Sequence, residues 1–246
     1  MNRYILSGML MVLMGLTQCR ISRPVVENIR GAEEGLDGYR SVCGRRDSVE
    51  SVTISRVNAL IHIQEERYEA RLILYHRFDS IIFVSAVSGG FEVLRGTADR
   101  DSIRVIDRIN KIVYVSSIHR NLGYELPVTF KDLECMTNLY GCCGLIEHSG
   151  EFKGQDIIFD LSGDFMNKKI YLDRESFGLS GFEFINTRSN EYFTGKKEAD
   201  GGFRIFSNFI IDAFELEVEG GERVYNRKMA VNMEFNRKRY DVIKIQ

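Results

Sequence analysis

Proline is scarce in this chain of 246 residues, which contains only Pro24 and Pro127, and no repeat of constant period is present. Because proline interrupts the ladders of a sheet, its scarcity permits many strands, while the missing repeat argues against a solenoid or propeller. A basic excess is also missing: without residues 1–18 the chain has 32 Lys and Arg against 35 Asp and Glu, a net charge of −3. Nucleic acid is therefore an unsuitable partner, because phosphate binding needs concentrated positive charge.

Motifs of several enzyme and metal-site classes are missing as well. The sequence has no Gly-x-Ser-x-Gly nucleophile elbow and no Walker phosphate loop. Its four histidines, at positions 62, 76, 119 and 148, lack the spacing of metal ligands on one helix. We therefore expect no catalytic residues, no metal and no cofactor.

Residues 101–108 contain two acids, a serine and two arginines, and Asp101, Ser102, Asp107 and Arg108 are of types that also serve in catalysis. On a strand, Asp101 and Asp107 point to the same face, so the two acids flank an apolar surface at its ends. This spacing favours structural roles. We expect Asp107 and Arg108 to cap the following turn and to pair with a neighbouring strand, for example through Arg95.

The first 18 residues have the layout of a signal peptide. A single positive charge at Arg3 precedes an apolar run of 13 residues, from position 4 to position 16. A permanent membrane helix needs about 20 apolar residues, so this run is too short to be one. We predict a signal peptide over residues 1–18.

The signal segment ends at Cys19, with Leu16 three positions before it. This arrangement resembles the lipobox of bacterial lipoproteins, in which the cysteine is lipidated and becomes the new N-terminus. Gln18 departs from the pattern because a small residue is usual there, so ordinary signal cleavage and a relaxed, species-specific lipobox are both alternatives. The resemblance implies acylation of Cys19, for example with palmitate. Such acylation anchors a protein durably to a membrane, because each buried methylene contributes about 0.8 kcal/mol.

Four further cysteines follow, at Cys43, Cys135, Cys142 and Cys143. Export brings a protein into oxidising conditions, so we expect one or two disulfides; Cys135 lies close in sequence to both Cys142 and Cys143. The spacing does not determine the pairing. No second pair of cysteines or histidines completes a zinc site, which favours disulfides or buried thiols.

We predict a lipidated tether over residues 19–46 and one folded domain over residues 47–246. The tether region is charged and contains glycines, with little apolar periodicity. Over residues 57–64 and 68–74 apolar and polar side chains then alternate, which is typical of two strands joined as a hairpin. The first strand and its partner therefore mark the start of the domain.

Strand patterns continue over most of the domain. They cover residues 81–86, 89–95, 101–111, 112–116, 156–161, 168–172, 181–185, 191–194, 203–215, 229–235 and 240–245. Gly220-Gly221 has the composition of a bend or turn between strands. A helix is expected over residues 130–140, with Thr129 as N-cap, Asp132 at the third position and Gly141 as the stop. Short strands at regular spacing predict a mainly β sandwich, barrel or half-barrel.

The order of motifs over residues 88–141 resembles one family. Residues 88–96, then 101–111, then a short helix ending at residues 139–141 are similar to uncharacterised lipoproteins described as LolB-like. The resemblance implies a fold like that of LolA and LolB, an unclosed antiparallel β-barrel (half-barrel) with a few helices covering the concave face. In that superfamily the cavity holds lipid or the acyl chains of lipoproteins in transit.

A curved sheet with one apolar face must bury that face, and this sequence has much strand but little helix to cover it. We therefore expect an incompletely covered apolar face that binds lipid or acyl chains. The candidate ligand-binding residues are Ile61, Ile63, Leu72 and Leu74 on the sheet, with Met136 and Leu139 of the helix as a lid. The alternative for each residue is a place in a filled hydrophobic core.

These inferences predict a non-catalytic lipoprotein of the cell envelope, anchored at the outer membrane and facing the periplasm. Its expected partner is a lipid or an acylated lipoprotein. One alternative is a structural or docking module for other envelope proteins. Another is an envelope hydrolase, although no nucleophile and base can be paired from their spacing.

Overall fold

The computed structural model describes residues 32–44, 48–63, 66–117, 129–137, 142–144, 150–164, 166–208 and 214–245. Within these ranges the α-helices are α2 (Ala32–Gly44) and α3 (Phe130–Thr137). The strands are β1 (Ser51–Ile63), β2 (Glu66–Arg77), β3 (Ile81–Ser88), β4 (Phe91–Ala98), β5 (Ser102–Asp107), β6 (Ile112–Ser117), β7 (Gly150–Lys153), β8 (Asp156–Asp160), β9 (Met166–Asp173), β10 (Leu179–Asn186), β11 (Tyr192–Lys197), β12 (Phe203–Ser207), β13 (Phe214–Tyr225) and β14 (Asp241–Ile245).

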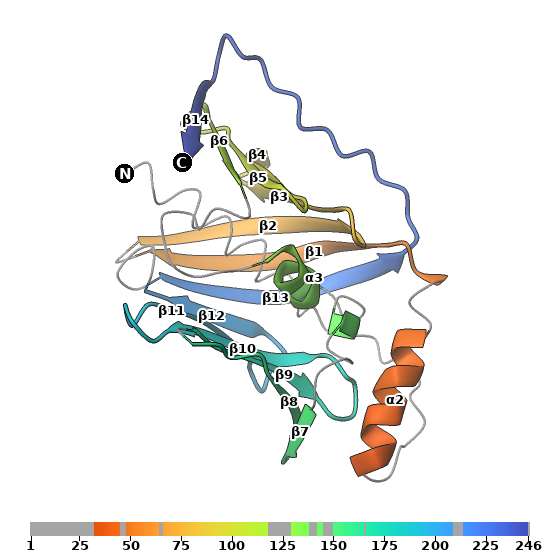
Figure 1. Ribbon diagram of the computed structural model, residues 1–246. Helices are drawn as coiled ribbons and strands as arrows, with labels where there is room; N and C mark the ends of the chain where they lie inside the picture. The colour runs from red at the N-terminus through yellow and green to blue at the C-terminus, as the bar shows by residue number, and fades with distance from the viewer. Residues whose placement is uncertain are drawn as a thin grey trace.

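All fourteen strands belong to one unclosed sheet, with β14 at one edge and β7 at the other (Figure 1). Their order across the sheet is β14-β6-β5-β4-β3-β2-β1-β13-β12-β11-β10-β9-β8-β7. Every pairing is antiparallel except that of β14 with β6, which is parallel. The predicted fold class, mainly β with an unclosed antiparallel sheet and few helices, is confirmed.

The sheet consists of two meanders joined at its centre. Strands β1 to β6 lie side by side in chain order, and β7 to β13 do the same, so that β13 returns to pair with β1. Their ladder runs from Val52 opposite Tyr225 to Ile63 opposite Phe214. This pairing brings the two halves of the chain together over the full length of the longest strands.

A bulge interrupts β1 at Arg56, which has a φ of 58°. On the facing strand, Gly220 and Gly221 have φ values of 76° and 115°, in the region that favours glycine. These two glycines therefore lie inside β13. The expectation of a turn between strands at Gly220-Gly221 is wrong, because the glycines accommodate the bulge while the ladder continues on both sides of it.

The two faces of the sheet differ. The core face carries the main hydrophobic cluster, including Val57, Ala59, Leu72, Leu74 and Val218. Side chains alternate along a strand, so the residues between these point to the opposite, outer face. Polar and charged residues dominate the part of the outer face that lies over the middle of β2, β1 and β13.

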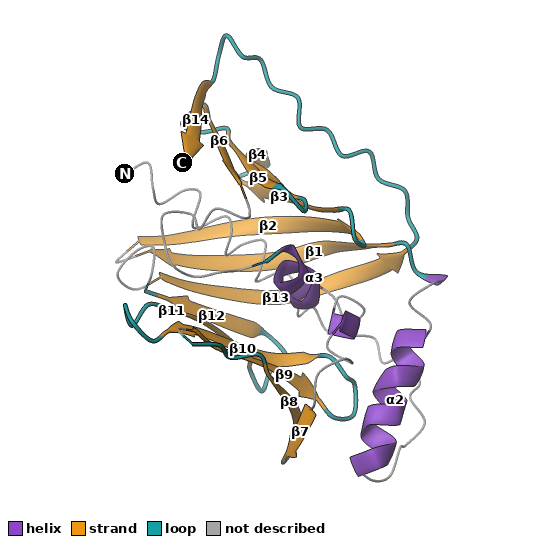
Figure 2. Cartoon of the chain, in the orientation of Figure 1, coloured by secondary structure: helices purple, strands orange, loops and turns teal. Residues whose placement is uncertain are grey.

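The chain between β13 and β14, residues 226–240, forms no strand (Figure 2). In its central part, partly buried residues alternate with exposed ones from Met229 to Asn236. Its backbone is held at Asn232, whose carbonyl accepts a 2.6 Å hydrogen bond from Arg95 Nη1. The predicted strand at 229–235 is wrong, because the alternation reflects burial of one side without ladder pairing. The expected strand at 203–215 is likewise divided, since β12 ends at Ser207 and β13 begins at Phe214.

The predicted tether also needs correction. Residues 32–44 form helix α2, whose Tyr39 and Val42 are buried in the main hydrophobic cluster. The Tyr39 hydroxyl donates a 2.5 Å hydrogen bond to the Cys142 carbonyl, and a disulfide joins Cys43 to Cys143. This part of the predicted tether is therefore attached to the folded domain, and the signal peptide at 1–18 and Cys19 lie outside the described residues.

Candidate ligand-binding site

The core face brings together the predicted ligand-binding residues that the structure describes. Leu72 and Leu74 of β2 and Met136 of α3 are fully buried, and Ile61 of β1 is partly buried against the same cluster. Their shared position agrees with an apolar sheet face facing a helix. It also agrees with a filled core, so their role in ligand binding stays a prediction.

Two predicted ligand-binding residues cannot be placed in this site, because the side chain of Ile63 and the whole of Leu139 lie outside the described residues. The predicted lipidation site, Cys19, also lies outside them. The expected helix over 130–140 begins where predicted but α3 ends at Thr137, and the expected stop at Gly141 also lies outside the described part of the chain.

Helix α3 lies against the core face near β1 and β13 (Figure 1). Its Phe130, Leu133 and Met136 belong to the main hydrophobic cluster. The predicted N-cap is confirmed: the Thr129 amide and hydroxyl both donate to Asp132 Oδ2 at 2.8 Å, and the Asp132 amide donates back to Thr129 Oγ1 at 3.3 Å. An eight-residue helix is too short to be stable alone, so these apolar contacts and further anchors must hold it on the sheet.

The first anchor is a buried polar cluster between β2 and α3. His76 Nε2 lies 3.1 Å from Glu134 Oε1, and His76 Nδ1 lies 2.7 Å from Thr137 Oγ1. Burial alone would raise the pKa of Glu134, but hydrogen bonds from His76 and Lys131 outweigh it and lower that pKa. Glu134 is therefore a carboxylate that can only accept, so His76 Nε2 must carry the donated proton.

Two further anchors lie at the N-terminal end of α3. Lys131 forms ion pairs with Asp79, in the turn between β2 and β3, and with Glu134 at 2.9 Å. On the other side Lys168 of β9 pairs with Asp132 and lies 5.2 Å from the centre of the Phe184 ring. Helix α3 is thus attached to strands from both halves of the sheet.

Disulfides tie the end of α3 to α2. Cys135 pairs with Cys142, and the adjacent Cys143 pairs with Cys43 of α2. The sequence left the pairing open, and the structure supplies two disulfides. Together with the polar anchors, they restrict how far α3 can move from the core face.

Sequence reasoning assigned no role to His76 or Glu134. A signal was present, because His76 follows Leu72 and Leu74 at period two and so shares their buried face. Its partner Glu134 is 58 residues away in the sequence, and no local sequence pattern predicts that the two side chains meet.

The stretch at 101–108 has the structural role that its spacing predicts. Asp107 Oδ1 accepts hydrogen bonds at 2.9 Å from the amides of Ile109 and Asn110, which caps the turn. The expected partner is different, however, because Arg95 and Arg108 both pair with Glu92, at 2.7 and 2.5 Å.

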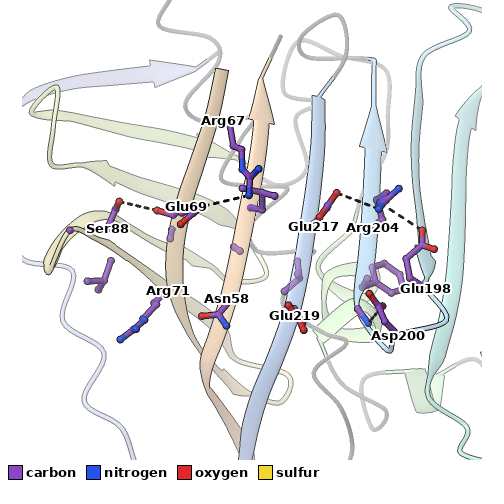
Figure 3. A pocket seen from close by; sticks show the side chains of 18 of the residues that line it. Asn58, Arg67, Glu69, Arg71, Ser88, Glu198, Asp200, Arg204, Glu217 and Glu219 are labelled. Carbon is purple, nitrogen blue, oxygen red and sulfur yellow. Dashed lines mark hydrogen bonds and ion pairs between the residues drawn. The ribbon is translucent and has the colours of Figure 1, made fainter. Parts of the chain in front are cut away.

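The outer face carries a groove of about 790 Å³ over the middle of the sheet (Figure 3). Its floor is formed by β2, β1 and β13, and the turns after β3 and β11 contribute to its ends. Charged residues line it on both sides, as Figure 3 shows for Arg67 and Arg71 on β2 and for Glu217 and Glu219 on β13. This groove was not anticipated, because it depends on the register of strands that are distant in sequence.

Within the described ranges, no group of three or more His, Cys, Asp or Glu side chains is arranged to hold a metal ion. No helix in the same part of the chain has the length and apolar character needed to span a membrane.

Comparison with known proteins gives structural likeness only. No protein-family model and no curated protein matches the sequence. A DUF1329 family protein from Desulfovibrio piger has a similar structure, with 9% identity and a TM-score of 0.50, and the match covers 80% of this chain and 94% of that chain. At this identity the likeness concerns the fold alone, and it extends over most of both proteins.

Two other solved structures match at lower scores. A domain from Vibrio parahaemolyticus, named for outer membrane lipoprotein sorting, is 14% identical with a TM-score of 0.47, covering 81% of this chain and 95% of that chain. A LolA superfamily protein from Nitrosomonas europaea is 10% identical with a TM-score of 0.46, covering 78% and 94% respectively. A LolA superfamily protein is thus among the structures similar to this chain.

Proposed function

We propose that this chain is a lipid-anchored protein of the cell envelope that binds a hydrophobic ligand without catalysing a reaction. The ligand is a lipid or the acyl chains of another lipoprotein, and it binds to the core face beneath α3. The anchor is an acylated Cys19 at the outer membrane, with the domain facing the periplasm. The two disulfides support an exported location, because disulfides persist in oxidising compartments.

The observation that carries this proposal is the way the apolar sheet face is covered. Helix α3, one of the two described helices that pack on the cluster, contributes Leu133 and Met136 to it and is fixed by polar side chains and by disulfides. Displacing α3 would uncover part of the cluster to which Leu72 and Leu74 belong, and an acyl chain would replace the lost apolar contacts. Each methylene that leaves water contributes about 0.8 kcal/mol, so a partly buried chain can compensate for the displacement.

The direct test uses the full chain, produced in a bacterium and extracted from its membranes in mild detergent. Native mass spectrometry followed by organic extraction should reveal a bound lipid, and the emptied protein should take up a fluorescent fatty-acyl probe. A protein that carries no lipid and takes up no probe would contradict the proposal. If it also held a stoichiometric envelope protein, a docking function would replace it.

A pair of variants tests whether the ligand lies beneath α3. Glu134→Gln weakens the anchor of α3, so the open state becomes more populated and the probe should bind about tenfold more tightly. Glu92→Gln makes the same change away from α3, at a carboxylate that accepts hydrogen bonds from Ser85, Arg95 and Arg108. It should leave probe affinity unchanged. Equal effects of the two substitutions would place the ligand elsewhere.

A further inference from the structure

The groove on the outer face has the dimensions of a small-molecule site. Its volume of about 790 Å³ lies within the range of about 300 to 1,000 Å³ that is typical of ligand pockets. Leu60, half-buried in the middle of β1, contributes an apolar side chain to a lining that combines polar and apolar residues. At one end Gly89 and Gly90 form the turn after β3, and neither has another atom within 4 Å of where a side chain would begin. This end of the groove therefore stays open.

Most of the charges around the groove are paired with one another. Arg67 pairs with Glu69 at 3.5 Å, both on β2. Arg204 of β12 lies 3.3 Å from Glu217 and 3.8 Å from Glu198. These pairs neutralise much of the charge of the lining.

Asp200 accepts a hydrogen bond from the Gly202 amide at 2.8 Å. Three further polar lining residues form one row across the sheet. Asn58 of β1 lies opposite Arg71 of β2 on one side and opposite Glu219 of β13 on the other. Figure 3 shows them in the order Arg71, Asn58, Glu219. All three are exposed, and none forms a hydrogen bond or ion pair with another residue in the described ranges. A cation, an amide and an anion are therefore available side by side.

We propose that this groove binds a short peptide with free ends. The peptide's carboxylate pairs with the Arg71 guanidinium, its ammonium pairs with the Glu219 carboxylate, and a peptide bond between them meets the Asn58 amide. Arginine suits a carboxylate because its planar fork donates two parallel hydrogen bonds. The Asn58 side chain both donates and accepts, as a peptide group does.

The spacing of the row sets the length of the peptide. Arg71 and Glu219 are two strand spacings apart, which corresponds to about 10 Å between their backbones. An extended chain covers at most about 3.3 to 3.6 Å per residue. Two or three residues therefore fit between the charged ends, with a side chain directed towards Leu60. This site lies on the face opposite α3 and does not depend on lipid binding at the core face.

The test measures binding of trialanine to the full chain by isothermal titration calorimetry. Arg71→Gln and Glu219→Gln should each weaken binding by about tenfold or more. The matched controls are Arg77→Gln on β2 and Glu222→Gln on β13, which remove the same charges outside the groove and should leave affinity unchanged. N-acetylated trialanine has no ammonium, so its affinity should not change in Glu219→Gln. Trialanine amide has no carboxylate, so its affinity should not change in Arg71→Gln.

Two results would overturn the proposal. One is an absence of trialanine binding at millimolar concentration to a protein whose circular dichroism shows that it is folded. The other is equal binding by wild type and by both groove variants. Glycerophosphoethanolamine, a lipid head group with one ammonium and one phosphate, serves as a comparison ligand. If it binds through Arg71 and Glu219 while trialanine does not, the groove recognises a head group and the peptide proposal fails.

Discussion

His76 of β2 and Glu134 of α3 face each other in the interior, with side chains that are 0% and 1% exposed and a distance of 3.1 Å between Nε2 and Oε1. Glu134 Oε1 also accepts a 2.6 Å hydrogen bond from the Asp79 amide. A buried carboxylate that accepts several hydrogen bonds keeps its negative charge. If the carboxylate is protonated or removed, those donors lose their acceptor. The polar part of the contact between α3 and β2 therefore depends on the ionisation of Glu134.

Acidification should weaken this contact. The pKa of Glu134 in the folded protein is lowered from its ordinary value of about 4.5, so the stabilisation that the carboxylate provides is complete above that value and is lost as the pH falls through the folded-state pKa. Glu134→Gln should lower the free energy of unfolding at neutral pH by about 2 kcal/mol. It should also flatten the decline in stability between about pH 5 and the folded-state pKa. Chemical denaturation at a series of pH values measures both effects.

The matched control for this experiment is Glu175→Gln, at an exposed position between β9 and β10. It should change neither the stability at neutral pH nor the slope with pH. If Glu134→Gln gave the same acid dependence as wild type, the acid sensitivity of the fold would have to come from other carboxylates.

The two disulfides should differ in their effect on stability. Cys43 and Cys143 are separated by 100 residues, and Cys135 and Cys142 by 7. A crosslink that closes a longer loop removes more entropy from the unfolded chain, about 4 to 5 kcal/mol against about 2 kcal/mol for these two loops. The double variant Cys43→Ala/Cys143→Ala should therefore lower the free energy of unfolding more than Cys135→Ala/Cys142→Ala does.

Peptide mapping of the unreduced protein by mass spectrometry checks the pairing on which this comparison depends. It should recover Cys43 linked to Cys143 and Cys135 linked to Cys142. An exchanged pairing between the adjacent Cys142 and Cys143 would contradict the structure. The long loop would still be the one that Cys43 closes, so the expected order of the two effects on stability would not change.

The strands of the first half of the sheet were predictable because burial on one face produces alternation in sequence. Val57, Ala59 and Ile61 point to the core face, while Asn58 and Leu60 point outwards. The same rule failed at residues 229–235. There the alternation is real, but it marks an extended segment with one shielded side and no ladder partner. Periodicity reports burial, and hydrogen-bond pairing needs separate information.

Helix α2 was missed for a different reason. Its burial depends on Tyr39 and Val42 meeting the cluster and on Cys43 reaching a partner 100 residues away. Charged residues and glycines dominate the surrounding sequence, so the local composition resembles a linker. The polar anchor of α3 and the row across the groove also depend on contacts between residues that are distant in the sequence. A single sequence does not specify such contacts.

Gly195 of β11 should not tolerate a side chain. A Cβ atom at this position would lie 2.6 Å from Cζ of Phe182 and 2.6 Å from Cε1 of Phe203, two rings of the core face. Both rings are almost fully buried and cannot retreat without disturbing their neighbours. Gly195→Ala should therefore lower the free energy of unfolding by about 3 kcal/mol.

Gly163→Ala is the control, because a Cβ atom there meets no atom within 4 Å. Thermal unfolding of the two variants should show a clear loss of stability for Gly195→Ala and little change for Gly163→Ala. Equal melting temperatures would mean that the aromatic cluster around Gly195 is packed more loosely than the structure shows.

Acylation at Cys19 is the basis of the predicted membrane anchor, and two substitutions test it in opposite directions. Cys19→Ser removes the thiol that would be acylated, so the protein should lose incorporation of a palmitate analogue and move from the membrane fraction to the soluble fraction. Gln18→Ala places a small residue where the lipobox has one, so the acylated fraction should rise. If Cys19→Ser remained in the membrane fraction and wild type incorporated no palmitate analogue, ordinary signal cleavage would account for the N-terminus. Another part of the chain would then have to hold the protein at the membrane.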